Sequence, residues 1–172
     1  GRMGTEWIHR EINLGDIKII HEYHGETSSN DTKEVIKKII DYGVDLIVYA
    51  GGDGTTRDIV AELTKLDKPK LPLIGVPTGV KMYSGSFAAS PKAAAEVLSA
   101  WIRGDLLVAS TEVLDLDEEK YRDGEWIVRH YAEAHTPSSP RWMQGSKQRV
   151  EVSSEEEIIE GLAEHIQETL VK

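Results

Sequence analysis

Helical periods alternate with short apolar runs from Asp31 to about Gly104, and this alternation constrains the fold more than any other feature. The runs at 46–50 and 73–76 are continuously apolar and do not alternate with polar residues. Such runs are typical of strands that are covered on both faces, and strands alternating with helices are typical of βαβ units. The sequence therefore predicts an α/β fold: an open parallel sheet with helices on both faces.

Local signals place the ends of the helices. Asp31 with Glu34 predicts a capping box at the start of one helix, and Gly43 predicts its end. Ser90 and the proline after it predict the start of another helix, which we expect to end at Gly104. The expected core faces are Val35, Ile36, Ile39 and Ile40 in the first helix, Ile59, Val60, Leu63 and Leu66 in the second, and Ala94, Val97, Leu98, Trp101 and Ile102 in the third.

The pattern changes on both sides of this region. A short helix at 5–13 and a strand at 17–21 are expected before it, and strands at 106–116 and 126–134, joined by a turn at 121–124, after it. A loop at 137–149 and a last helix, with Ser154 and Glu157 as a capping box, follow. We therefore expect an α/β domain at 1–104, a small β extension at 105–152 and a C-terminal helix at 153–172. Because a βαβ pattern calls for further strands at both ends, we also expect a piece of a longer protein, with weak or no kinase activity alone.

Composition excludes several classes of function. The 172 residues suit one domain or slightly more, and the net charge of -10 argues against general nucleic-acid binding. The absence of cysteine excludes disulfides, thiolate zinc sites and cysteine nucleophiles. Neither a membrane-spanning run nor a signal peptide is evident, so no membrane association and a cytoplasmic location are expected.

The segment Gly51-Gly52-Asp53-Gly54-Thr55 lies where a predicted buried strand passes into a helix. Open α/β sheets bind ligands at such points, and glycine-rich backbone followed by a helix N-terminus can hold a phosphate. Asp53 is unusual beside a phosphate, which indicates a role in orienting or deprotonating a substrate hydroxyl or in holding Mg²⁺. The alternative is a tight turn in which Asp53 caps the helix. Neither the dinucleotide fingerprint nor the P-loop occurs.

This pentapeptide resembles the signature loop of NAD kinases, diacylglycerol kinases and sphingosine kinases, and more loosely that of phosphofructokinases. The segments 56–59 and 75–85 are similar to a branch of predicted ATP- or polyphosphate-dependent NAD kinases related to the acetoin catabolism X protein, as are 2–4, 27–32, 112–117 and 144–147. The resemblance covers nearly the whole chain and is most specific from Ala50 to Ser90.

The resemblance implies an α/β domain whose active site is completed by a second, β-rich domain. Asp53 matches the aspartate that interacts with the hydroxyl being phosphorylated, and Gly51, Gly52, Gly54 and Thr55 match the phosphate-contacting loop. We expect Asp53→Asn to lower the rate by a factor of ~10² while leaving the fold intact. The Asn-Glu pair and the Gly-Ser-Thr-Ala-Tyr-like stretch of classical NAD kinases do not occur in this sequence.

A second set of candidates lies in the window 68–95, which has four lysines and no acidic residue. If the fold gathers Lys68, Lys70, Lys81 and Lys92 on one face, they could attract a phosphorylated ligand. The alternative is that these lysines are solvated and unrelated. Lys81 is the best candidate; the other expected contacts nearby are Thr78, Gly79, Tyr83 and Ser84.

Other polar groups give weaker signals. Arg141, Lys147 and Arg149 in the second acid-free window, 137–149, indicate either a flap over phosphates or a plain solvent loop. The acidic cluster at 115–119 could bind Mg²⁺, although a solvated turn after a strand is the better explanation. The histidines lack a metal-binding spacing, so no metal site within the protein is expected.

The leading hypothesis is a phosphotransferase that moves phosphate from ATP or polyphosphate to a hydroxyl of NAD or a similar nucleotide. Mg²⁺ would arrive with the nucleotide. The alternatives are a small-alcohol or lipid kinase and a non-catalytic nucleotide-binding module. The expected partner is a small-molecule nucleotide, and a homo-oligomer is compatible with the sequence.

Overall fold

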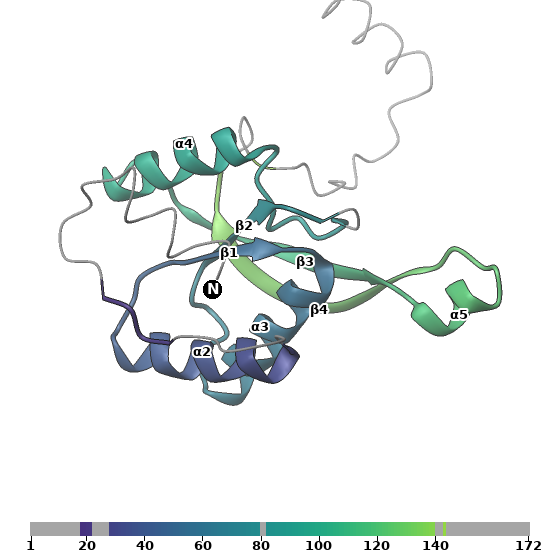
Figure 1. The fold of residues 1–172 in the computed structure, drawn as a ribbon. Coiled ribbons are helices and arrows are strands. Elements are labelled where there is room, and N and C mark those ends of the chain that lie inside the picture. Colours follow the sequence, from purple (N-terminus) through teal and green to yellow (C-terminus); the bar gives the residue numbers. More distant parts are fainter. Residues whose placement is uncertain (1–17, 22–27, 80–81, 140–142, 144–172) are drawn as a thin grey trace, which may run out of the picture.

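The computed structural model of the protein describes residues 18–21, 28–79, 82–139 and 143. The elements in chain order are α2 (Ser29–Asp41), β1 (Ile47–Gly51), α3 (Asp53–Lys65), β2 (Leu73–Pro77), α4 (Pro91–Ile102), β3 (Val108–Leu116), α5 (Glu118–Arg122) and β4 (Val128–Pro137). Figure 1 shows α4 on one side of β1 and β2, and α2 with α3 on the other. The predicted α/β class with helices on both faces is confirmed.

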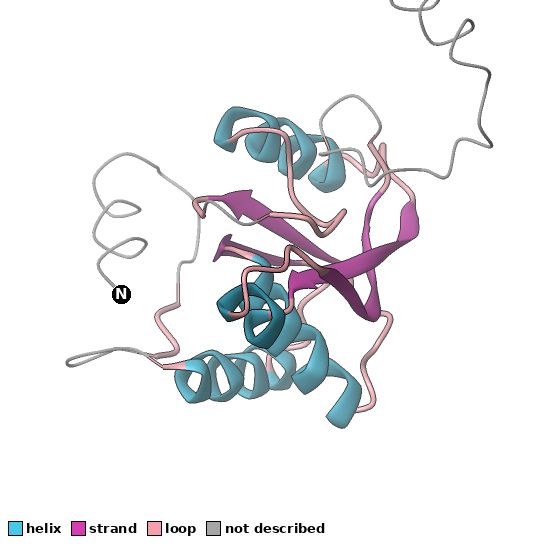
Figure 2. Ribbon diagram, turned by 90° about the vertical axis from the view of Figure 1, so that its right-hand side faces the viewer, coloured by secondary structure: helices cyan, strands magenta, loops and turns pink. Residues whose placement is uncertain are grey.

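Strands β1 and β2 pair in parallel, with Ile47 opposite Leu73 and Gly51 opposite Pro77. The core between the sheet and the α2–α3 layer contains mainly Ile36, Ile47, Tyr49, Ile59, Val60, Leu63, Leu73 and Phe87. A second cluster, formed by Ile74, Ala88, Ala93, Ala94 and Val97, lies beneath α4. Figure 2, turned by 90°, again shows one helix on one side of the parallel strands and the other helices on the opposite side. Because the carboxyl ends of both strands meet at one edge, the loops that follow them are brought together.

The segment after β2 returns to the sheet. Gly75 N donates to Ser86 O (2.9 Å), and Ala88 N donates to Gly75 O (3.0 Å). A Cβ at Gly75 would lie 2.4 Å from Phe87 Cδ1, so only glycine lets this fully buried ring pack against the strand. Residues 86–88 thereby form a third row beside β2.

The prediction that both faces of β1 are covered is wrong for the described part of the chain. Val48 is 46% exposed, whereas Ile74 on β2 is completely buried. The cause is the position of α4, which packs against β2 and leaves the same face of β1 open.

The ends of the helices follow the sequence signals with one correction. Helix α2 starts three residues earlier than predicted: Ser28 is the N-cap, and Asp31 accepts from Ser28 N (2.6 Å) instead of capping the helix with Glu34. This backbone hydrogen bond is the main cause that lowers the pKa of Asp31. Gly43 ends the helix at φ 69°, as predicted.

Helix α4 begins as predicted, with Ser90 Oγ accepting from Ala93 N (3.0 Å) and Pro91 in its first turn. Its core face differs at the C-terminal end. Ala94 and Val97 are buried, but Ile102 is 75% exposed because Ala100 occupies the buried side of the last turn.

Strands β3 and β4 form an antiparallel hairpin with an irregularity between Val113 and Leu114. The expected turn at 121–124 is wrong in part, because the short helix α5 includes its first two residues. Asp117 starts this helix by accepting from the backbone N–H groups of residues 119 and 120. In Figure 1 the hairpin extends away from the sheet, with α5 at its far end.

Several expected elements fall at the margins of the structure. Residues 18–21 contain no strand, which contradicts the strand expected at 17–21 for the described positions. The expected helix at 5–13, most of the loop at 137–149 and the helix at 153–172 lie outside the described residues. Among the helices that the structure describes, none is long and apolar enough to cross a membrane.

Candidate functional site

Two loops lie side by side at the carboxyl ends of the parallel strands. The first runs from Gly51 into α3, and the second begins with Thr78 and Gly79 after β2. Thr78 Oγ1 donates to Gly51 O at 3.5 Å, and a Cβ at Gly79 would lie 3.4 Å from the Cα of Gly52. The structure therefore brings the two predicted glycine-rich segments into direct contact.

The first loop leaves the start of α3 accessible. Gly52 is the N-cap, without a side-chain hydrogen bond, and its carbonyl accepts from Thr55 N and Thr56 N, both at 3.1 Å. The first N–H groups of a helix have no partner within the helix, and they carry its positive dipole end. A Cβ at Gly54 would meet nothing within 4 Å, whereas one at Gly51 would lie 2.6 Å from Thr55 Oγ1. One glycine is thus required for packing, and the other faces open space.

The Asp53 carboxylate joins the two loops. Its Oδ2 accepts from Tyr83 N (2.6 Å), and its Oδ1 accepts from Ser84 N (2.9 Å) and Ser84 Oγ (2.6 Å). Ser84 Oγ also accepts from Leu114 N (3.0 Å), which ties this point to β3. Asp53 is 1% exposed. It is the first residue of α3 and not its cap, so the alternative role as an N-cap is wrong.

This geometry defines what Asp53 can do in the conformation described. A carboxylate offers about four lone-pair positions, and three are taken by these donors. The remaining position on Oδ2 can accept a substrate hydroxyl only if residues 83–84 move aside, because the side chain is buried. Asp53 thus fixes the second loop against the first.

A network of hydroxyl groups beneath the first loop was not anticipated from the sequence. Tyr49 Oη lies 2.5 Å from Thr56 Oγ1 and 3.0 Å from Ser86 Oγ, and Thr56 Oγ1 donates to Gly52 O at 3.2 Å. Burial raises the pKa of Tyr49 to about 12, with the nearby charge of Asp53 adding to the rise. The network holds the Gly52 carbonyl in place from below. The sequence signal that could have predicted this network is Tyr49 on a buried strand, followed by Thr56 in the first turn after the glycine-rich loop.

Two lysines of the acid-free window lie away from this site, because Lys68 and Lys70 precede β2 at the opposite end of the sheet. Lys92 is exposed in the first turn of α4. Lys81 lies outside the described residues. Of the four expected contacts beside it, Thr78 and Gly79 border the first loop, and Tyr83 and Ser84 bind Asp53.

The acidic cluster after β3 is engaged in structural contacts. Asp115 pairs with Arg57 on α3 (3.1 Å), and Asp117 pairs with Arg129. In the part of the chain that the structure describes, no three His, Cys, Asp or Glu side chains are grouped to hold a metal ion.

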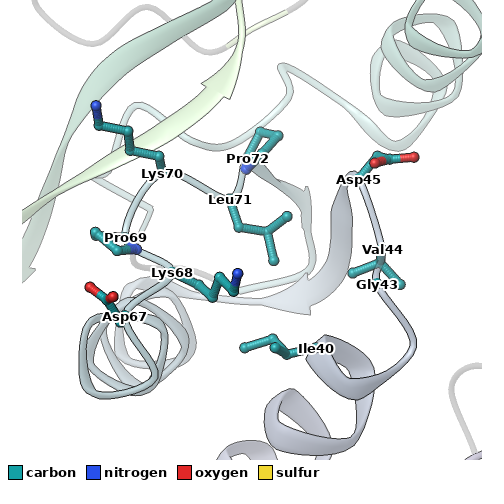
Figure 3. A pocket seen from close by; sticks show the side chains of 10 residues that line it. All are labelled: Ile40, Gly43, Val44, Asp45, Asp67, Lys68, Pro69, Lys70, Leu71 and Pro72. Atoms are coloured by element: carbon teal, nitrogen blue, oxygen red, sulfur yellow. The ribbon is translucent and has the colours of Figure 1, made fainter.

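A cavity of about 630 Å³ lies at the amino ends of the strands, opposite the glycine-rich loops. Figure 3 shows Ile40, Lys68 and Leu71 pointing toward this space, whereas Asp45 and Lys70 point away. Open α/β sheets bind their ligands at the carboxyl ends of the strands. We therefore place the candidate site at the glycine-rich loops and not in the cavity at the amino ends.

Comparison with known proteins identifies the family of the chain. Neither the curated proteins nor the solved structures gave a match to the chain. The family model of the ATP-NAD kinase N-terminal domain matches residues 5–106, which include β1, β2 and both glycine-rich loops. This match indicates a kinase-type enzyme that works with ATP and NAD-like nucleotides. On the strength of this match over more than half of its length, the chain belongs to the ATP-NAD kinase N-terminal domain family.

Proposed function

We propose that the protein transfers phosphate from ATP or polyphosphate to a hydroxyl group of NAD or a similar nucleotide. The observation that carries this proposal is the open start of α3 at Gly54, bordered by the second loop at Gly79. Helix N-termini at the carboxyl edge of a sheet bind phosphates through backbone N–H groups and the helix dipole. The family match supports the same chemistry.

The residues divide between the phosphates and the acceptor. The backbone of Gly51, Gly52 and Gly54 and the hydroxyl of Thr55 hold donor phosphates. Thr78 and Gly79 border the same space, and Tyr83 binds Asp53 beside it. Lys81 neutralises phosphate charge. Mg²⁺ is bound by the phosphates themselves and supplies further neutralisation of the charge that develops during transfer.

Asp53 orients the acceptor hydroxyl in this proposal. Ser84 N and Ser84 Oγ both hold Oδ1, so the carboxylate keeps its direction when Oδ2 is released. Acceptor binding then displaces Tyr83 N from Oδ2 and exposes that oxygen. A carboxylate held in this way is suited to accept the proton of the hydroxyl as phosphate is transferred.

The burial of Asp53 favours a second candidate, a nucleotide-binding module without turnover. With 1% exposure and three hydrogen bonds, the carboxylate already has a complete structural role. A protein of this kind would bind phosphates at the first loop while residues 83–84 stayed in place.

A transfer assay separates these candidates. The protein at high concentration is incubated with Mg²⁺ and either ATP labelled at the γ-phosphate or labelled polyphosphate, and with NAD, sugars or diacylglycerol as acceptor. We expect label on NAD or a related nucleotide. Label on sugar or lipid alone would assign a different kinase activity. Binding of ATP by titration calorimetry without any transfer would favour the binding module, and the absence of both would refute the phosphate site.

A further inference from the structure

A row of three aromatic rings begins at the candidate site and runs into the β3–β4 hairpin. The rings of Tyr83 and Trp126 meet edge to face, with centroids 6.5 Å apart and planes at 79°. Trp126 and Tyr121 meet in the same way at 5.6 Å and 80°. The middle ring is therefore held between two tyrosines from different segments.

This row is attached directly to the Asp53 carboxylate. Tyr83 donates its backbone N–H to Asp53, and its ring contacts Trp126, which lies between α5 and β4. Figure 1 shows the hairpin extending from the sheet, with α5 at its far end. Tyr83 therefore connects the aromatic row to Asp53, through its ring on one side and its backbone N–H on the other.

Trp126 is oriented but not buried. Its two ring contacts restrict the indole, yet Trp126 remains 63% exposed. An oriented and exposed indole is suited to stacking because little conformational freedom is left to be lost on binding. The more exposed Leu107, at 82%, lies next to Val108 at the other end of the hairpin, so it does not share this surface.

We propose that Trp126 stacks on the base of a purine nucleotide whose phosphates bind the Gly51–Thr55 loop. The inference rests on the proposed function for the phosphates and adds a subsite for the base. Aromatic side chains stack on nucleobases through their π-faces with little dependence on base identity, and a two-ring indole matches the area of a purine. The subsite would therefore contribute affinity for both ATP and NAD.

The test compares ATP with inorganic tripolyphosphate, which has the phosphates but lacks the base. Titration calorimetry with Mg²⁺ is performed on the wild type, Trp126→Ala, Trp126→Phe and Ile102→Ala. We expect Trp126→Ala to weaken ATP binding about tenfold, the usual range for losing one stacked base. Tripolyphosphate binding should stay unchanged, and Trp126→Phe should restore most of the affinity for ATP. Ile102→Ala, which removes an exposed apolar side chain on α4, should bind both ligands as the wild type does.

Two results would overturn the inference while leaving the phosphate site intact. They are wild-type affinity of Trp126→Ala for ATP and an equal weakening of tripolyphosphate binding. Failure of the wild type to bind either ligand would instead refute the proposed function, and the base subsite with it.

Discussion

The Asp53 carboxylate holds residues 83–84 against α3 through three hydrogen bonds in a buried position. In Asp53→Asn, an amide NH₂ group replaces one carboxylate oxygen. This NH₂ group would face a donor of residues 83–84 where the carboxylate oxygen now accepts. We therefore expect Asp53→Asn to cost stability as well as activity, so a loss of activity in this variant alone would not assign a catalytic role.

We expect Asp53→Asn to lower the free energy of unfolding by about 2–3 kcal/mol, the usual cost of leaving a buried polar group unsatisfied. The rate of phosphate transfer should fall by ~10² or more in the fraction that stays folded. Urea denaturation followed by single-turnover kinetics measures both.

Ser84→Ala is the matched control because it removes one of the three hydrogen bonds to Asp53, together with the one from Leu114 N, and keeps the charge of Asp53. It should lower stability by about 1–3 kcal/mol. If Ser84→Ala reduced turnover as strongly as Asp53→Asn, Asp53 would be a structural residue and its assigned role would be wrong.

Tyr49 makes stability depend on pH in the alkaline range. Its pKa is raised from 10.0 to about 12, so the folded state keeps the phenol proton at pH values where the unfolded chain loses it. Its stabilising contribution is fully present below pH 10 and is lost as the pH rises toward 12. Because one pKa unit corresponds to about 1.4 kcal/mol, this residue should reduce the free energy of unfolding by about that amount between pH 8 and pH 11.

Urea titrations at several pH values, on the wild type and Tyr49→Phe, measure this contribution. The difference in stability between the two proteins should shrink as the pH rises above 10. A difference that stayed constant up to pH 11 would contradict the raised pKa.

Among the elements, α3 is followed by Asp67, whose backbone conformation is unfavourable for a residue with a side chain. Asp67 has φ 56°, and Lys68 N donates to Leu63 O (2.9 Å), an arrangement in which glycine is usual. Its negative charge also faces the negative end of the helix dipole. Asp67→Gly should therefore raise the free energy of unfolding by about 1 kcal/mol, seen as a rise of a few degrees in Tm.

Asp41→Gly is the control for this prediction, because Asp41 is also an acid at a helix C-terminus but lies within α2. It removes the same charge from a helical position, where glycine is unfavourable. Equal stabilisation by both substitutions would show that charge, and not backbone conformation, is the cause.

The elements differ in how far the sequence could predict them. Strands β1 and β2 and helix α4 have strong local signals, such as the continuous apolar runs and the Ser90-Pro91 start, and their ends agree with the prediction within two residues. For α3 the sequence predicts the core face but not the ends. The prediction places the start of α2 at Asp31, whereas Ser28 is the N-cap and Asp31 is the third residue of the helix and part of its capping box. Both residue types are good caps, so the residue types alone do not decide between them. The open face of β1 depends on where α4 packs, which periodicity does not encode.

The site was predictable in its residues but not in its contacts. Glycines after an apolar strand identify a ligand loop from local sequence alone. The hydrogen bonds from Asp53 to residues 83–84 and the aromatic contact with Trp126 join segments 30 or more residues apart, and no local pattern reports such contacts. Lys68 and Lys70 illustrate the converse, since they are close in the sequence to the second loop but lie at the opposite end of the sheet.

In the whole molecule, the β3–β4 hairpin contacts the α/β layers next to Asp53. Ser84 Oγ accepts from Leu114 N on β3, and Arg57 on α3 pairs with Asp115 on the same strand. The two glycine-rich loops and β3 therefore form one connected structure around Asp53. The central claim is that this structure binds phosphate at the open start of α3.

Gly54→Ala tests this claim most directly. A Cβ at Gly54 meets no atom within 4 Å, and alanine is favoured over glycine within a helix, so stability should stay unchanged or rise by up to about 1 kcal/mol. The added methyl group would occupy the space proposed for a phosphate. Calorimetric titration with Mg²⁺ and tripolyphosphate should show binding by the wild type and about tenfold or weaker binding by Gly54→Ala. Equal affinity in the two proteins, with both folded, would contradict phosphate binding at this loop.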